Sequence, residues 1–242
     1  MVKKVIISPP FGTYVELPWA TSVKGSFTLH RRPGLPERVI KTLRPTSRGW
    51  VNKIGLRNPG IKSITKWRTD VVYSLAVAED PQEWLDIYNC LFQNVPVLKN
   101  INLELNVSCP NVHARKSTIE DIMPIIKRYN WVSVKLPPTD DAYYWINALS
   151  ETKAVIHLSN TVPTPAGGLS GRHILEKNML LLRYARSNTN LPIIAGGGIY
   201  SPLEVEEYAG LGADYISLAT VFLSPWRFPG VFWALKKQGF ID

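Results

Sequence analysis

With 242 residues, of which 45% are hydrophobic, the chain can bury the core of one domain the size of an α/β barrel. It has no apolar run of about 18 residues and no apolar N-terminal stretch of signal-peptide length, so we expect a cytoplasmic protein, and its two cysteines are too few for a disulfide framework or a four-cysteine metal site. The net charge of +9 suits an anionic substrate and cofactor as well as a nucleic acid, but the basic residues are spread along the chain, which argues against a nucleic-acid-binding arm.

Short runs of β-branched or apolar residues, bounded by Gly, Pro, Asn or Asp, predict strands, and one-sided apolar patterns between the later runs predict helices. We expect strands at residues 5–8, 22–28, 71–77, 102–107, 131–135, 154–158, 192–195 and 215–218, and helices at residues 81–92, 118–129, 140–149, 174–186 and 202–210. This alternation indicates a parallel sheet, and eight strands close a (β/α)₈ TIM barrel. Without repeats or linkers, residues 1–242 are expected to form a single domain.

The regular alternation fails near the N-terminus. About thirteen residues separate the first two predicted strands, and Pro9, Pro10 and Pro18 interrupt them, so the first helix is expected to be reduced or missing. A partner protomer is one way to cover the gap. Residues 29–52 are rich in Pro, Arg and Gly, which predicts a long surface loop over one mouth of the barrel.

The two cysteines have opposite surroundings. Cys109 follows the fourth predicted strand within Asn106-Val-Ser-Cys-Pro-Asn111, where the flanking residues are poor core formers and active-site residues of TIM barrels lie. Cys90 is placed beside Leu91 on the first predicted helix, which indicates a packing role. Cys109 is therefore the candidate reactive thiol, and a small buried hydrophobe is its alternative role.

Small residues follow three consecutive predicted strands. They are Gly167-Gly168, Gly197-Gly198 and Ala219-Thr220. Glycine lets a phosphate group approach backbone N–H groups closely, and TIM barrels commonly bind phosphate after strands seven and eight. These positions are expected to hold the phosphate of a cofactor; tight turns are the alternative for any one pair.

The segments NKIGLRNPG, ELNVSCPN, VKLPP, SNT, GGLSGR, LPIIAGGGI and ISLAT occur in this order within residues 5–225. In sequence and order they resemble the signatures of dihydroorotate dehydrogenases, which are FMN-binding TIM barrels. The cysteine before Pro-Asn resembles the soluble, cysteine-base class. The resemblance implies oxidation of dihydroorotate to orotate, with Cys109 removing the C5 proton while a hydride passes from C6 to N5 of the flavin.

The resemblance also implies roles for other positions. Lys135 would lie against the N1 and C2 carbonyl of the flavin and stabilise its reduced anion, whereas a surface lysine is the alternative. Lys24 matches the family's lysine near flavin and substrate. Substrate-binding positions would be Lys24, Asn52, Gly55, Leu56, Asn106, Asn111, Asn160 and Thr161, and cofactor-binding positions would be Lys24, Lys135, Gly167, Gly168, Gly197, Gly198, Ala219 and Thr220.

Departures from the family pattern leave other activities open. The loop after Asn111 reads Val-His-Ala-Arg-Lys without the family's Pro-Gly, and the segment between Asn160 and Gly167 is short. Another pyrimidine is therefore an alternative substrate. A dihydrouridine synthase acting on tRNA is a further alternative that the basic charge suits, although its motifs fit less well. A degenerate, non-catalytic barrel subunit is the third alternative.

The electron acceptor does not follow from these residues. Fumarate, a flavin and iron–sulfur partner subunit, and a dye-like oxidant all remain open, and quinone is disfavoured. Apart from the small-molecule pyrimidine, we expect a homodimer as the assembly, and neither a nucleic-acid nor a membrane partner.

Overall fold

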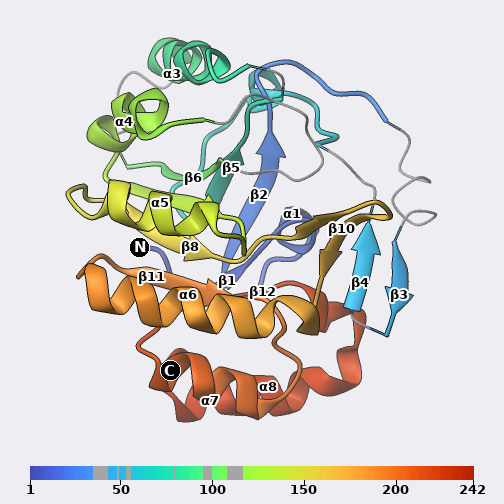
Figure 1. The fold of residues 1–242 in the computed structure, drawn as a ribbon. Coiled ribbons are helices and arrows are strands. Elements are labelled where there is room, and N and C mark those ends of the chain that lie inside the picture. Colours follow the sequence, from blue (N-terminus) through green and yellow to red (C-terminus); the bar gives the residue numbers. More distant parts are fainter. Residues whose placement is uncertain (35–42, 48, 53–55, 79, 95–99, 108–116) are drawn as a thin grey trace.

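The computed structural model describes residues 1–34, 43–47, 49–52, 56–78, 80–94, 100–107 and 117–242, and its centre is a closed barrel of eight parallel strands (Figure 1). The strands are β1 (Val5–Ile7), β2 (Thr21–Phe27), β5 (Val72–Leu75), β6 (Asn102–Asn106), β7 (Trp131–Leu136), β8 (Val155–Leu158), β11 (Ile193–Gly196) and β12 (Tyr215–Leu218). Their order around the barrel is β1-β12-β11-β8-β7-β6-β5-β2. The predicted TIM barrel and its eight strands are confirmed.

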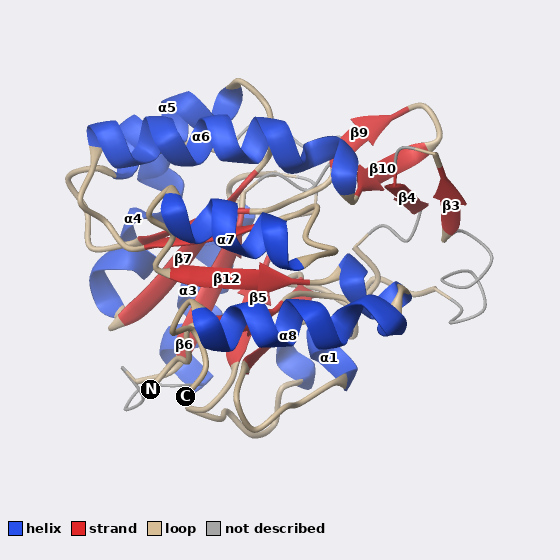
Figure 2. Cartoon of the chain, turned by 90° about the horizontal axis from the view of Figure 1, so that it is seen from below, coloured by secondary structure: helices blue, strands red, loops and turns tan. Residues whose placement is uncertain are grey.

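Helices cover the outside of the barrel (Figure 2). They are α3 (Glu83–Asn94), α4 (Ile119–Arg128), α5 (Asp141–Leu149), α6 (Leu175–Asn188), α7 (Pro202–Gly210) and α8 (Phe228–Lys237). The first five match the predicted helices within two residues at each end. Helix α7 begins where predicted, because Ser201 precedes Pro202 and the Ser201 N–H donates to the Glu204 carboxylate at 2.6 Å.

A second, antiparallel sheet lies beside the barrel. Its strands are β3 (Arg44–Thr46), β4 (Gly49–Asn52), β9 (Val162–Thr164) and β10 (Gly167–Ser170), in the order β3-β4-β10-β9. In Figure 2 the arrow of β12 points toward the side where this sheet lies, so the sheet stands at the carboxyl-terminal mouth of the barrel. The prediction of a loop throughout residues 29–52 is wrong for β3 and β4, because β4 pairs with β10 far along the chain, Val51 opposite Leu169.

The expected reduction of the first helix is confirmed. Only the single turn α1 (Phe11–Tyr14) lies between β1 and β2. The segment after it packs on the chain's own C-terminal helix: the ring of Trp19 lies 5.8 Å from that of Phe228 and 5.2 Å from that of Phe232. This aromatic cluster of Trp19, Phe228 and Phe232 packs the segment against α8.

Candidate active site

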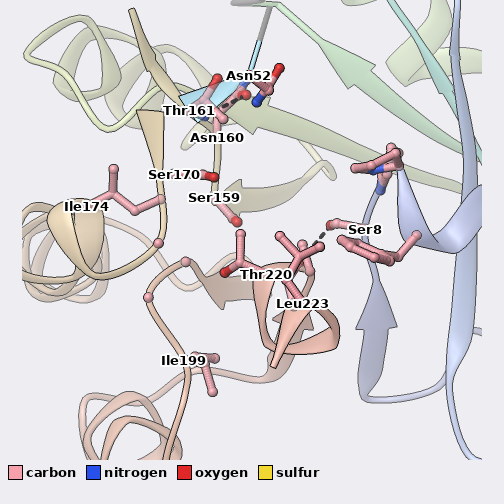
Figure 3. Close-up of a pocket in the computed structure, with 18 of the residues that line it drawn as sticks. Ser8, Asn52, Ser159, Asn160, Thr161, Ser170, Ile174, Ile199, Thr220 and Leu223 are labelled. Atoms are coloured by element: carbon pink, nitrogen blue, oxygen red, sulfur yellow. Dashed lines mark hydrogen bonds between the residues drawn. The ribbon is translucent and has the colours of Figure 1, made fainter. Parts of the chain in front are cut away.

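A pocket opens at the carboxyl-terminal mouth of the barrel and encloses about 870 Å³ of empty space, including its open mouth. Residues at or next to the carboxyl ends of β1, β7, β8, β11 and β12 line it, namely Ser8, Lys135, Ser159, Gly197 and Ala219. The small sheet contributes Asn52 and Ser170. Figure 3 shows Ser159, Ser170 and Thr220 around the same space. The site therefore lies where TIM barrels place their chemistry.

One end of the pocket is lined largely by backbone. Gly171, Gly197, Gly198 and Thr220 lie there, and the first three have φ values of 96°, 87° and 79°. A Cβ on Gly197 would meet Ile174 Cδ1 at 2.6 Å, so glycine is required for the loop after β11 to pack against α6. Gly198 has a left-handed backbone in the loop after β11, and Thr220 is the first residue of a short 3₁₀ helix, where a backbone N–H has no acceptor within that helix. Such N–H groups are suited to bind the phosphate of a flavin nucleotide.

Amide side chains gather in the part of the site that includes Lys135. The Asn160 side-chain amide donates to Asn106 Oδ1 at 3.1 Å, and Asn160 Oδ1 accepts from the Thr161 N–H at 2.9 Å. Asn52 and Thr161 lie close to Asn160 in the same view (Figure 3). Lys135 is the penultimate residue of β7, lines the pocket and is only 7% exposed. Asn52, Lys135, Asn160 and Thr161 line the pocket, and Asn106 lies behind Asn160.

An ionisable pair lies within the barrel. His157 Nδ1 and Glu104 Oε2 are 2.6 Å apart, and both side chains are buried. Burial lowers the pKa of His157, so its neutral ring donates to the carboxylate through Nδ1–H. Burial works against the ionised carboxylate, but the charge of Lys135 and the hydrogen bond from His157 outweigh it and lower the pKa of Glu104 to about 2. A carboxylate and an ammonium therefore face the barrel interior together.

Several predicted site residues lie elsewhere. Alternation along β2 places Val23 inside the barrel and Lys24 outside, where the Lys24 ammonium is 2.7 Å from Glu16 Oε1. The pocket lining does not include Lys24, Leu56, Gly167 or Gly168. The two glycines belong to β10, whereas Gly171, which follows that strand, lines the pocket.

Cys109, Gly55 and Asn111 lie outside the described residues, so their predicted roles stay predictions. Cys90 is 9% exposed in the core cluster that contains Ile87 and Leu91, which agrees with its predicted packing role.

Sequence reasoning missed the serines of the pocket and the buried ionisable pair. Ser8 and Ser217 line the pocket, and their hydroxyl groups are 2.7 Å apart. Glu104 and His157 sit in predicted strands whose neighbours are apolar, as in Leu-Glu-Leu and Ile-His-Leu. A charged residue flanked by apolar neighbours in a barrel strand faces the interior, so this alternation was the available signal.

None of the helices within the described ranges is long and apolar enough to cross a membrane. The family model for dihydroorotate dehydrogenase matches residues 14–238. A dihydroorotate dehydrogenase B (NAD(+)) catalytic subunit from Oceanobacillus iheyensis is 29% identical over 211 residues, which cover 72% of this chain and 67% of that protein. A dihydroorotate dehydrogenase A (fumarate) from Lactiplantibacillus plantarum is 29% identical over 217 residues, covering 74% and 70%.

Solved structures agree on the fold. The crystal structure of dihydroorotate dehydrogenase from Eimeria tenella in complex with ferulenol superposes with a TM-score of 0.67 at 16% identity, covering 99% of this chain and 83% of that one. The ligand-free form from the same organism gives a TM-score of 0.65. At this identity the likeness concerns the barrel alone.

Proposed function

Because the chain belongs to the dihydroorotate dehydrogenase family, whose function is the flavin-dependent oxidation of dihydroorotate, we propose that it binds FMN in the described pocket for this reaction. The observation that carries the proposal is the pocket itself. It combines a glycine-lined end at Gly171, Gly197 and Gly198 with a buried lysine, Lys135. A phosphate dianion and an electron-rich ring system need these two surroundings.

Two groups of pocket residues support FMN as the cofactor. The N–H groups of Gly198 and Thr220 would bind its phosphate, with Ala219 and Gly197 beside them. Lys135 would lie against the ring, where a fixed cation favours the reduced anion. When bound, FMN supplies the hydride acceptor for C6 of the substrate.

The chain's own residues would hold the substrate and move its proton. Asn52, Asn160 and Thr161, supported by Asn106, present donors and acceptors that match the alternating edge of a pyrimidine carboxylate. We assign removal of the C5 proton to Cys109, on the resemblance of its Ser-Cys-Pro-Asn segment to the soluble class. Asn111 would act with the substrate amides.

Reduced flavin must then pass its electrons to an acceptor. The relatives are named for two acceptors, NAD(+) and fumarate, and those of the first kind are named catalytic subunits. Those names support an electron-transfer partner subunit as one option for this chain. The homodimer and the cytoplasmic location stay predictions.

A titration followed by anaerobic reduction tests the proposal. The purified chain is titrated with FMN by calorimetry and then mixed with dihydroorotate while flavin absorbance is recorded. We expect one FMN per chain and bleaching that yields one orotate per flavin. A chain that binds no FMN, or one whose flavin other dihydropyrimidines bleach and dihydroorotate does not, would overturn it.

A further inference from the structure

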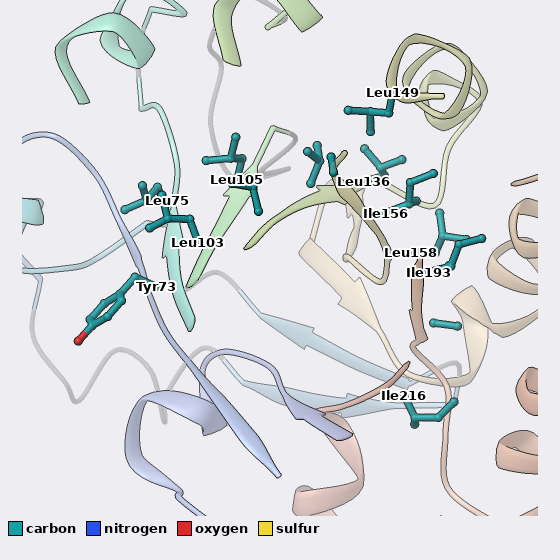
Figure 4. Packing of buried hydrophobic residues seen from close by; sticks show 14 of the residues in the cluster. Tyr73, Leu75, Leu103, Leu105, Leu136, Leu149, Ile156, Leu158, Ile193 and Ile216 are labelled. Carbon is teal, nitrogen blue, oxygen red and sulfur yellow. The ribbon is translucent and has the colours of Figure 1, made fainter. Parts of the chain in front are cut away.

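The inside of this barrel changes character along its axis. Its lower layer is largely apolar and contains Val72, Val155 and Ile194, with the buried Asn102 in register with Val72. Two residues further along the same or neighbouring strands come Ser74, Glu104 and His157, all buried and all polar. TIM barrels usually fill such layers with branched aliphatic side chains. On the outer face of β6, Leu103 and Leu105 pack in the usual apolar way (Figure 4).

Burial of this polar layer destabilises the fold, because its own hydrogen bonds leave some buried polar atoms without a partner. Glu104 and His157 are 1% and 0% exposed. Beyond their mutual hydrogen bond, Glu104 Oε1 and His157 Nε2 have no partner among the described residues. Burying a carboxylate with one oxygen unpartnered strongly destabilises a fold, so a counter-charge nearby is expected.

Lys135 supplies a positive charge one inward-facing position along the barrel from Glu104. Its backbone is in register with His157 on β8 and with Asn106 on β6, and Glu104 is in register with Ser133, one inward-facing position below Lys135. Lys135 is therefore level with His157 and one inward-facing position above Glu104, and it also lines the pocket. The positive charge of Lys135 contributes to the lowered pKa of Glu104 and, least of the causes, to that of His157.

We propose that Glu104 and His157 form a buried positioning pair that holds the Lys135 ammonium at the floor of the pocket and sets how strongly it favours reduced flavin. His157 orients the carboxylate through its Nδ1–H, and the carboxylate orients Lys135 and offsets part of its charge. The inference rests on the proposed function, because it concerns the same pocket. Neither residue touches substrate or flavin in this account.

The first test needs no flavin. Unfolding of the apoprotein is measured for Glu104→Gln, Lys135→Met and the double variant. We expect the double variant to lose less stability than the sum of the single losses, by roughly tenfold in the folding equilibrium constant. The matched control uses Ser133→Ala in place of Glu104→Gln, because it changes no charge in the same buried layer. The stability losses of Ser133→Ala and Lys135→Met should add. Additive losses for Glu104 and Lys135 would overturn the pair's link to the lysine.

The second test measures the midpoint potential of bound flavin. Glu104→Gln removes a negative charge and should make the flavin easier to reduce, by at least about threefold in the ratio of reduced to oxidised flavin at a fixed potential. Ser133→Ala should leave the ratio unchanged. If Glu104→Gln does not fold, the midpoint potentials of His157→Asn and His157→Leu test the proposal instead. Asparagine keeps an N–H donor near the position of His157 Nδ1, and leucine does not. An unchanged potential in His157→Leu would then contradict the proposal.

The two outcomes separate the claims. If the parent chain binds no FMN, the proposed function fails. The unfolding measurements on the single and double variants of the apoprotein still test whether Glu104 and Lys135 are coupled. If FMN binds and dihydroorotate reduces it, yet the stability losses are additive and the potential does not move, only the positioning pair fails.

Discussion

Cys109 is the residue on which the proposed chemistry depends most. A positioned base contributes roughly 10²–10⁴ in rate, so Cys109→Ala should slow flavin reduction by dihydroorotate by that factor at neutral pH and leave FMN binding intact. Cys109→Ser should retain part of the activity and need more alkaline pH, since a hydroxyl is harder to ionise than a thiol. Stopped-flow absorbance across pH measures both.

Cys90→Ala is the control, because Cys90 lies in the core beside Leu91. Parental reduction by Cys109→Ala together with failure of Cys90→Ala would show that the base is misassigned.

Lys135 is the second residue with a defined chemical task. Only reduced flavin carries the negative charge that the ammonium neutralises, so Lys135→Met should slow single-turnover reduction by roughly 10²–10³ while FMN still binds. The control is Lys153→Met, a lysine whose ammonium donates to Lys127 O at the exposed surface. Equal rates of flavin reduction in both variants would show that Lys135 has only a structural role.

At the scale of elements, the loop after β11 is the most constrained part of the pocket. Gly197 has φ of 87° and no room for a Cβ beside Ile174, so Gly197→Ala should displace the loop and weaken FMN affinity at least about tenfold. The matched control is Gly210→Ala at the end of α7, where a Cβ meets nothing within 4 Å. Calorimetric FMN titration compares them, and equal affinities would show that the phosphate is bound elsewhere.

The barrel elements were predictable because their signals are local. Each strand is a short apolar or β-branched run, and helices such as α7 carry their own start signals at Ser201 and Pro202. The small sheet was missed because its pairing is not local: Asn52 on β4 faces Gly168 on β10. Helix α8 was missed because Pro229 and Gly230 interrupt its pattern, yet both fall in its first turn, where helices tolerate them.

The same distinction applies to the site. Residue types at strand ends predicted Lys135, Asn160 and Gly197, since the ends of parallel strands meet at one mouth of the barrel. The direction of Lys24 depends on which face of β2 it occupies, and the register of β2 shifts against β5 between Gly25 and Phe27. A family pattern read along one strand does not fix that face.

At the scale of the whole molecule, the aromatic cluster of Trp19, Phe228 and Phe232 joins the N-terminal segment to α8. Trp19→Ala should lower the free energy of unfolding by about 2 kcal/mol, because a partly buried indole and its ring contacts are lost. Trp226→Ala is the control, since that side chain is 73% exposed and should change stability by less than about 0.5 kcal/mol. Equal losses in the free energy of unfolding for the two variants, measured with denaturant, would contradict the role of the aromatic cluster in joining the N-terminal segment to α8.

The most direct test of the whole account is a single anaerobic mixing experiment with the FMN-loaded chain. Dihydroorotate should bleach the flavin fully in one exponential phase and yield stoichiometric orotate, whereas tRNA containing dihydrouridine should leave it oxidised. Bleaching by the tRNA and none by dihydroorotate would contradict the assignment and leave a flavin barrel with a different pyrimidine substrate.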